Sequence, residues 1–392
     1  MKTSNLRRWA LVLTAWVAWA CLPAAQAERG DWRRIRPDAP VFGLDGRSHA
    51  ASCTGYPGTD RTFEFWSRRG SSRNLVVYFE GGGACWNDLT CTFPGDGSGA
   101  GLGFYTPAVP PGTDPALLDG IFNLQREDNP VRDWTMVYVP YCSADLHSGM
   151  AVQRYSNAGA PGLPAQFDIR HQGFDNTMVV LDWVRRNVDT PRQILVAGSS
   201  AGGYGATINF PWLRTIFPRA QLSLMADASQ GITTPDFDTG GPRVGRGSWN
   251  TQLPPWAAGI DPANIPGPQL MHMAAQANPQ VRVAQFTTVF DEVQIGFYGV
   301  MRGCLSLDGA CASVPVDWYT QMATAMLTDR ATLPNYRHYL AAGSYHTILA
   351  GPEFYTENSA GIAFKRWLGA MIGADDIPFS RWRNVACTGC LP

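Results

Sequence analysis

The sequence contains almost no lysine. Only Lys2 and Lys365 occur among its 392 residues. Reactions that use a lysine amine as nucleophile or base, such as Schiff-base or serine-lysine catalysis, therefore have almost no residue available. Basic and acidic side chains are balanced, at 31 and 32, and no basic tract occurs. This balance argues against nucleic acid or an anionic membrane surface as a partner.

Long apolar runs are also scarce. One run, residues 9–22, follows a basic start and precedes Ala25, Gln26 and Ala27, which have the small-x-small form of a signal-peptidase site. We expect residues 1–27 to be a signal peptide and residues 28–392 to form one domain of a secreted or periplasmic protein. No later run approaches the ~20 residues that span a bilayer. We therefore expect no membrane insertion once the signal is removed.

Nucleotide-binding loops are missing as well. The glycine-rich stretch at 198–205 fits neither G-x-G-x-x-G nor a loop that ends in Gly-Lys-Ser/Thr. It follows the apolar residues 194–197, and from Gly198 to Gly202 it has the form Gly-x-Ser-x-Gly. In that pattern a sharp turn between a strand and a helix exposes the serine hydroxyl, here that of Ser200. We predict such a nucleophile elbow; the alternative is a flexible turn without a chemical role.

A second glycine-rich turn lies upstream. Residues 74–80 form a near-continuous apolar run, typical of a strand covered on both faces, and Gly81, Gly82 and Gly83 follow it. Glycines at a strand end expose backbone N–H groups, as in the loop that builds half of an esterase oxyanion hole. The N–H of Ala201, next to Ser200, would supply the other half. The alternative is a plain glycine-rich loop.

A serine becomes a nucleophile near neutral pH only with a base and an acid that orients the base. Asp291 directly follows a predicted strand at 281–290, and His346 lies just beyond a predicted strand at 336–340. These residues follow Ser200 in the order serine, acid, histidine that α/β-hydrolases use. We therefore predict that Ser200, His346 and Asp291 act together.

Other acids and histidines are weaker candidates. Asp227 also follows a strand and is the main alternative acid; Glu292 would point away from its neighbour Asp291. His338 lies within a predicted strand and is interpreted as a packed or surface residue. Asp145 and His147 precede the serine and lack a third ligand nearby, so we interpret them as loop-structuring residues.

Nine cysteines occur, of which all but Cys21 lie beyond the signal. Their even number in an exported chain suggests disulfides. Short spacings favour the pairs Cys85–Cys91 and Cys304–Cys311, and the other pairings stay open. The C-x-x-C formed by Cys387 and Cys390 could instead be a redox pair or half a zinc site, but no second such pair accompanies it. We expect no metal and no cofactor.

Predicted strands and helices alternate through most of the chain. Apolar patterns indicate strands at 62–66, 74–80, 134–140, 194–197, 221–225, 281–290 and 336–340, and helices at 174–188, after Ser200, at 317–329 and at 359–372. This alternation predicts an α/β fold, α/β-hydrolase-like, with a mostly parallel sheet and helices on both faces. The stretch 233–268, rich in Pro, Gly and Trp, is interpreted as a cap insertion rather than a second domain.

In combination these motifs resemble the pectin acetylesterase and Notum-type carboxylesterase family. The resemblance rests on residues 79–87, on Tyr141, Cys142, Ser143, Asp145 and Gly149, on residues 198–203, on Asp291, Glu292 and Gln294, and on His346 and Thr347. It implies a catalytic triad of Ser200, Asp291 and His346, with Gly82, Gly83 and Ala201 as oxyanion donors. The family often has an aromatic residue where this chain has Gly83, or Trp where it has Ala84, so we expect an acyl pocket of different shape.

The sequence thus predicts an exported serine carboxylesterase that cleaves short-chain, chiefly acetyl, O-acyl esters through an acyl-enzyme. Its substrate would be an acylated small molecule or a plant polysaccharide such as pectin. One alternative is a protein or lipid deacylase. Another is an inactive carbohydrate-binding protein on the same scaffold, with Trp249 and Trp256 as sugar-stacking platforms.

Overall fold

The chain builds one large sheet from strands that are far apart in the sequence. The computed structural model describes residues 31–95, 103–239, 249–257, 259–261, 264–374, 376–387 and 390. The strands of the sheet are β1 (Arg33–Ile35), β4 (Phe65–Arg68), β5 (Asn74–Phe79), β6 (Thr135–Val139), β9 (Gln193–Ser199), β10 (Gln221–Asp227), β11 (Arg282–Thr288) and β12 (Tyr336–Ala341). The expected signal peptide, residues 1–27, lies outside the described residues.

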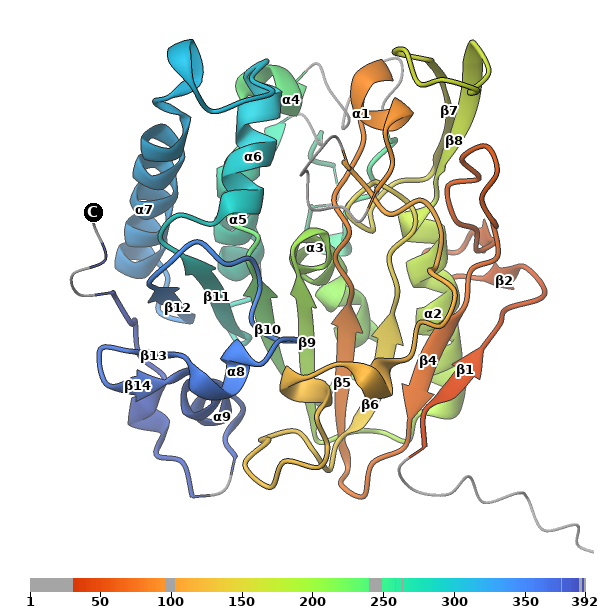
Figure 1. Cartoon of the computed structure of the whole chain (residues 1–392). Helices are drawn as coiled ribbons and strands as arrows, with labels where there is room; N and C mark the ends of the chain where they lie inside the picture. The colour runs from red at the N-terminus through yellow and green to blue at the C-terminus, as the bar shows by residue number, and fades with distance from the viewer. Residues whose placement is uncertain are drawn as a thin grey trace, which may run out of the picture.

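The sheet is mostly parallel, as predicted. Its order is β1-β4-β6-β5-β9-β10-β11-β12 (Figure 1). Neighbouring strands from β6 to β12 run parallel, whereas β4 is antiparallel to both β1 and β6. Consecutive strands are added on opposite sides of β5: the chain first adds β6 on one side and later adds β9 on the other. The position between β5 and β9 is therefore a topological switch point. Ligands of open α/β sheets bind at such a switch point.

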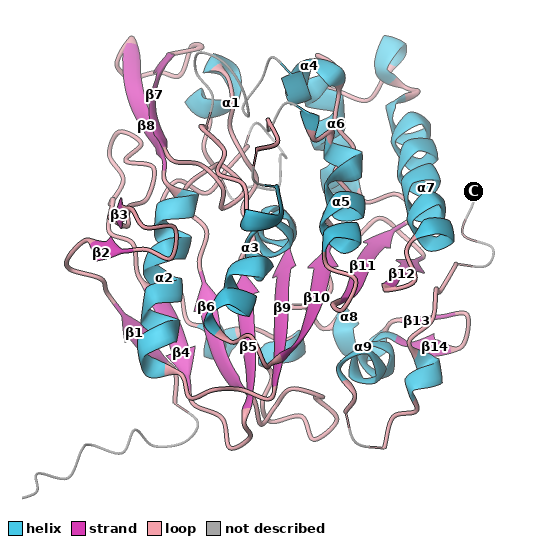
Figure 2. Cartoon of the chain, turned by 180° about the vertical axis from the view of Figure 1, so that it is seen from behind, coloured by secondary structure: helices cyan, strands magenta, loops and turns pink. Residues whose placement is uncertain are grey.

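Helices cover both faces of the sheet. Leu75 and Val77 of β5 pack in one apolar cluster, and Val76 and Tyr78 pack in another, because side chains alternate along a strand. The first cluster includes residues of α2 (Gly173–Asn187), α3 (Ala201–Ile216) and α5 (Leu270–Ala277), which cover the face seen in Figure 2. The second includes α9 (Phe364–Ile372), on the face seen in Figure 1. The α/β fold class is confirmed.

The carboxyl ends of the parallel strands carry most of the additional structure. Figure 1 shows α1 (Asp88–Thr92), α4 (Pro235–Thr239), α6 (Glu292–Met301) and the hairpin of β7 (Ala151–Ser156) and β8 (Gln166–His171) beyond the arrowheads. The remaining elements are β2 (Val41–Phe42), β3 (Ser48–His49), α7 (Val314–Thr332), α8 (Glu353–Thr356), β13 (Asn358–Ser359) and β14 (Ile362–Ala363), with a few short 3-10 turns.

Several elements differ from the prediction. The first predicted strand, 62–66, is shifted to β4, and the hairpin β7–β8 and the helices α5 and α6 were not predicted. The last helix was predicted from residue 359 but begins at Phe364. Ala360 and Gly361 both have positive φ, 50° and 73°, and they turn a short hairpin between β13 and β14 where the helix was expected.

Disulfides join the described cysteines in four pairs. Cys85–Cys91 and Cys304–Cys311 are the pairs that the short spacings favour, and Cys387 is bonded to Cys390. The fourth, Cys53–Cys142, spans 89 residues and was left open by the sequence. It ties the segment before β4 to the loop after β6.

The predicted insertion, 233–268, contains α4 and 3-10 turns in its described part. Trp249 is only 1% exposed, and its indole N–H donates to the carbonyl of Cys85 at 2.7 Å. It is therefore not a surface platform for sugar stacking, which corrects that part of the alternative prediction. Trp256 is half-buried against the core. None of the helices in the described ranges is both long enough and apolar enough to cross a bilayer.

Candidate active site

Ser200 lies at a sharp turn between β9 and α3. Its backbone has φ 56° and ψ −127°, a conformation that costs a non-glycine residue free energy. A Cβ at Gly198 would lie 2.1 Å from the carbonyl oxygen of Gly202, and one at Gly202 would lie 2.0 Å from that of Phe79. Both positions therefore require glycine, since strand, turn and helix approach each other so closely.

The glycine loop after β5 passes directly beside Ser200. A Cβ on Gly81 would lie 2.7 Å from the Ser200 Cβ, and Gly82 and Gly83 have φ of 152° and 70°. Thr106 N–H donates to the Gly82 carbonyl and Ala84 N–H donates to the Phe104 carbonyl, at 2.9 Å each. These bonds flank Gly83, whose own N–H has no partner in the described part of the chain. The loop can therefore offer a free N–H near the serine.

Asp291 and His346 are brought together by hydrogen bonds. The imidazole Nδ1 lies 2.8 Å and 2.9 Å from the two carboxylate oxygens of Asp291. Asp291 is fully buried at the N-cap of α6. The backbone N–H and the side-chain amide of Gln294 each donate to this carboxylate at 2.9 Å. With its acceptor sites filled in this way, Asp291 has little freedom to turn away from the imidazole.

The other imidazole nitrogen of His346, Nε2, is buried and has no hydrogen-bond partner among the described residues. Burial by itself lowers the pKa of His346, but the charge and hydrogen bond of Asp291, together with the charges of Asp227 and Glu292, outweigh burial and raise it. Ser200 and His346 line the same cavity. No hydrogen bond joins them within the described ranges, and such bonds are often long before substrate binds.

The alternative acids are placed differently. Asp227 is fully buried, and burial raises its pKa to about 6. It accepts hydrogen bonds from Ser199 Oγ and from two backbone N–H groups rather than from His346. Glu292 is exposed at the start of α6. His338 is 4% exposed within β12, away from the loops at the carboxyl edge.

Asp145 and His147 organise the loop after β6. Asp145 accepts bonds from Ser143 Oγ at 2.7 Å, from His147 N–H at 3.1 Å and from Gly173 N–H at 2.7 Å. His147 Nε2 donates to the carbonyl of Glu80 at 2.8 Å. Burial raises the pKa of Asp145 to about 7 and lowers that of His147 to about 4. These contacts fasten the loop to the base of the glycine turn and to α2.

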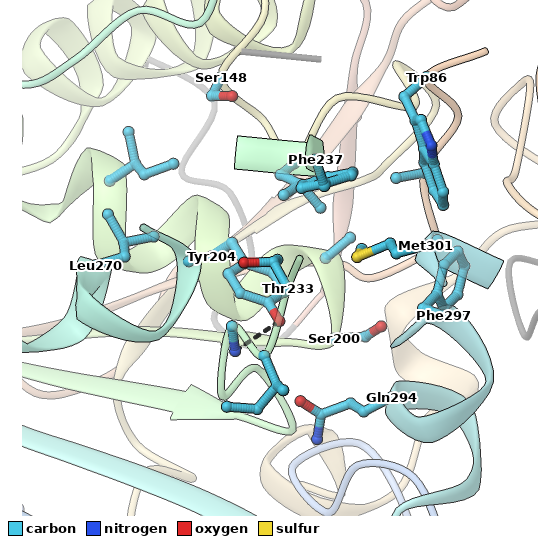
Figure 3. Close-up of a pocket in the computed structure, with 18 of the residues that line it drawn as sticks. Trp86, Ser148, Ser200, Tyr204, Thr233, Phe237, Leu270, Gln294, Phe297 and Met301 are labelled. Atoms are coloured by element: carbon cyan, nitrogen blue, oxygen red, sulfur yellow. Dashed lines mark hydrogen bonds between the residues drawn. The ribbon is translucent and has the colours of Figure 1, made fainter. Parts of the chain in front are cut away.

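An apolar cavity opens beside Ser200 (Figure 3). The space in it that admits the centre of a water-sized sphere is about 100 Å³. Figure 3 shows the Ser200 hydroxyl pointing toward the side where Phe297 lies. Most of the wall is apolar, with large contributions from Trp86, Ile232, Phe237, Trp249, Phe297 and Met301.

The sequence did not predict this cavity. Its wall comes from the segment before α1, from α4, from α6 and from residues near 249, which only the folded chain brings together. One signal was available: Val293, Phe297 and Met301 are spaced four residues apart and lie on one face of a helix. That signal would have predicted α6 but not what its apolar face contacts.

A metal site is not supported by the cysteines. Cys85, Cys91 and His171 have ligand atoms within 4.8 Å of one another. The two cysteines form a disulfide, so neither has a thiolate to offer. His171 is engaged with the Tyr155 hydroxyl at 2.9 Å.

Comparison with known sequences finds one family and several related proteins. Residues 47–240 match the pectinacetylesterase family. The matched range contains Gly82, Gly83 and Ser200 but not Asp291 or His346.

The related proteins are palmitoleoyl-protein carboxylesterases. The protein notum1' of Xenopus laevis is 29% identical over 168 residues, 41% of this chain and 30% of that protein. NOTUM of Homo sapiens is 30% identical over 146 residues, 35% of this chain and 25% of that protein. NOTUM of Schmidtea mediterranea is 26% identical over 146 residues, 36% of this chain and 25% of that protein. The matches thus span less than a third of each relative's length.

Proposed function

Because the chain belongs, through residues 47–240, to the pectinacetylesterase family, we propose that it is a carboxylic ester hydrolase with Ser200 as nucleophile. His346 is the base and Asp291 the acid that orients it. The observation that carries this proposal is that Ser200 and His346 line one cavity while Asp291 holds the far side of the imidazole.

The reaction follows from these positions. Ser200 Oγ attacks the ester carbonyl and His346 Nε2 takes the hydroxyl proton, because Nδ1 is committed to Asp291. Negative charge develops on the carbonyl oxygen, and the N–H groups of Gly82, Gly83 and Ala201 stabilise it. His346 then gives the proton to the leaving alcohol. Water attacks the acyl-enzyme by the same steps and releases the carboxylic acid.

The cavity favours an apolar acyl chain. Aromatic and aliphatic side chains such as Trp86, Phe237 and Phe297 bind methylene groups, each of which contributes about 0.8 kcal/mol when buried. The related proteins are named for a palmitoleoyl ester on protein. We propose that this enzyme prefers acyl chains longer than the acetyl group that the sequence suggested, and acetylated polysaccharide is the competing substrate.

The disulfides support a site of action outside the reducing cytosol. Export through the signal peptide at residues 1–27 belongs to the same proposal.

A panel of p-nitrophenyl esters from acetyl to dodecanoyl, with acetylated pectin and acetylated xylan beside it, tests the proposal. We expect kcat/KM to rise with chain length beyond acetyl. A maximum at acetyl, together with acetate release from pectin, would replace the long-chain proposal by the polysaccharide substrate. No hydrolysis of any ester, and no labelling of Ser200 by a fluorophosphonate, would favour the inactive carbohydrate-binding alternative.

A further inference from the structure

Asp227, the last residue of β10, makes contacts that the proposed triad does not explain. Its Oδ2 atom accepts three hydrogen bonds, from the Ser199 hydroxyl at 2.6 Å and from the N–H groups of Ile348 and Leu349 at 2.9 Å each. Ser199 immediately precedes the nucleophile, and Ile348 lies two residues after His346. One oxygen atom thus joins the elbow to the loop that carries the base.

Two further bonds extend this network across the sheet. The hydroxyl of Tyr78, in β5, donates to Ser199 Oγ at 2.9 Å, and the N–H of Ser200 donates to the backbone carbonyl of Asp227 at 2.8 Å. Tyr78 and Ser199 are 3% and 4% exposed. Three neighbouring strands and one loop are therefore connected through a buried polar network, in which hydrogen bonds are stronger than they are in water.

The residues that this network flanks have strained backbones. Ser200, Ala228 and Thr347 have φ of 56°, 52° and 68°. Such conformations are energetically unfavourable for residues other than glycine and persist where surrounding contacts hold them. For a β-branched residue such as Thr347 a positive φ is an outlier. Ile348 and Leu349, whose N–H groups bond to Asp227, directly follow Thr347 in the chain. The hydrogen bond from the Ser200 N–H to the Asp227 carbonyl holds the backbone of Ser200.

We propose that Asp227 is a positioning residue of the hydrolytic centre, which holds the Ser200 elbow and the His346 loop in place through Oδ2. This inference rests on the proposed function of Ser200 and His346. Asp227 acts through hydrogen bonds to the two segments, whereas Asp291 bonds directly to the imidazole.

The second oxygen of Asp227 makes the proposal testable. Oδ1 has no hydrogen-bond partner in the described ranges. Asp227→Asn can therefore keep its carbonyl oxygen at the Oδ2 position with all three bonds, whereas Asp227→Ala removes them. We expect Asp227→Ala to lower kcat about 100-fold, because a misplacement of about 1 Å has that effect. KM for p-nitrophenyl butyrate should change little, and Asp227→Asn should keep kcat within about tenfold of the wild type.

A matched control separates positioning from general stability. The side-chain amide of Asn335 also donates three hydrogen bonds, to the carbonyls of Ala275, Asn278 and Val281 at 3.0–3.1 Å. Asn335 directly precedes β12, so it lies at the amino-terminal ends of the parallel strands, whereas Ser200 and His346 lie beyond their carboxyl ends. Asn335→Ala should lower the melting temperature and leave kcat unchanged well below it. If Asp227→Ala does not fold, Ser199→Ala removes one of the three bonds and serves instead, with an expected loss in kcat of about tenfold.

The full-length protein is used throughout, with Ser200→Ala as the reference. A wild-type kcat in Asp227→Ala, or in the substitute Ser199→Ala, would overturn the positioning role while Ser200→Ala remains inactive. A loss in Asp227→Asn as large as in Asp227→Ala would also overturn it, because charge rather than hydrogen bonding would then be essential. Activity in Ser200→Ala would instead overturn the proposed function.

Discussion

Ser200 and His346 contribute the two groups that must exchange a proton. Ser200→Ala and His346→Ala should each lower kcat by about 10³-fold or more, and the double variant should be little worse than either, since the residues act as a unit. Steady-state kinetics with a p-nitrophenyl ester measures these losses. The exposed Ser306, whose hydroxyl bonds to Asp308, provides the control Ser306→Ala, which should keep full activity. A Ser200→Ala enzyme with a tenth of the activity would remove Ser200 from the mechanism.

Asp291 raises the pKa of His346, which has a measurable consequence. The imidazole must be neutral to act as a base, so the acid limb of the kcat/KM profile lies above the ordinary histidine value. Asp291→Asn should lower turnover by about 10⁴-fold and move this limb to lower pH, because the stabilising charge is gone. Glu292→Gln, at an exposed carboxylate that does not bond to His346, should keep turnover. If Glu292→Gln lost turnover and Asp291→Asn kept it, the assignment of Asp291 as the acid of the triad would be wrong.

At this scale sequence order is informative because the chemistry restricts residue types. The elbow pattern singled out Ser200, and the requirement for an acid and a base at strand ends singled out Asp291 and His346. The contacts of Asp227 could not be predicted, since they join residues 199, 227 and 348 through three-dimensional proximity. The roles of all these residues stay predictions until the variants are measured.

Helix α6 combines two roles, because its N-cap is Asp291 and its apolar face lines the cavity. Val293 is half-buried on that face. Val293→Phe should fill part of the cavity, so that kcat/KM for p-nitrophenyl octanoate falls at least about tenfold while that for the acetate ester changes little. Equal effects on both esters would mean that the acyl chain does not enter the cavity beside α6.

The Cys85–Cys91 bridge lies two residues beyond Gly83 and closes a loop of only a few residues. Three consecutive glycines are entropically costly to order. Replacing both cysteines by alanine should lower kcat markedly, beyond the loss of about 2–3 kcal/mol of stability that such a loop suggests. Replacing Cys387 and Cys390 in the same way should leave kcat nearly unchanged. Assays well below both melting temperatures make the comparison, and equal kcat values would contradict a role for the bridge in ordering the oxyanion loop.

The elements that could be predicted are those with a continuous apolar run or a regular spacing of apolar residues. The strands β5, β6 and β9 appear in the sequence as continuous apolar runs, because both faces of the sheet are covered. Helix α2 appears as apolar residues spaced three or four apart. In the hairpin β7–β8, exposed residues alternate with partly buried ones in β7 and with mostly buried ones in β8. Phe167 and Ile169 pack in a small apolar cluster apart from the two that cover the sheet. The turn at Ala360 and Gly361 interrupts the helical pattern expected from residue 359, so the last helix begins only at Phe364.

The whole molecule contains buried histidines that must stay neutral. His171 is fully buried, and burial lowers its pKa to about 3. Because the unfolded chain binds a proton near pH 6.5 and the folded chain does not, this group removes stability as pH falls from 6.5 toward 3. His171→Gln should therefore lower the free energy of unfolding by about 2 kcal/mol less at pH 5 than at pH 8, as measured by urea unfolding. Tyr155→Phe removes the same hydrogen bond and keeps the imidazole, so its cost should depend much less on pH. A cost of His171→Gln that is the same at both pH values would contradict this assignment.

At the scale of the fold, alternating patterns were enough to predict a parallel sheet between two helical layers. They could not predict strand order, because β5 lies between β6 and β9 only through long-range pairing. Nor could cysteine spacing predict the pair Cys53–Cys142, whose members are 89 residues apart.

The segment between Cys53 and Cys142 also bears on the order in which the sheet can form during synthesis. It contains β4, β5 and β6, which are adjacent in the sheet and can pair before β9 has emerged from the ribosome. Until then β5 has an open edge of unpaired backbone groups on an apolar strand, the kind of edge that recruits other chains. Between the completion of β6 and the arrival of the strand that carries Ser200, the growing chain therefore passes through a stage in which the apolar edge of β5 is open to other chains.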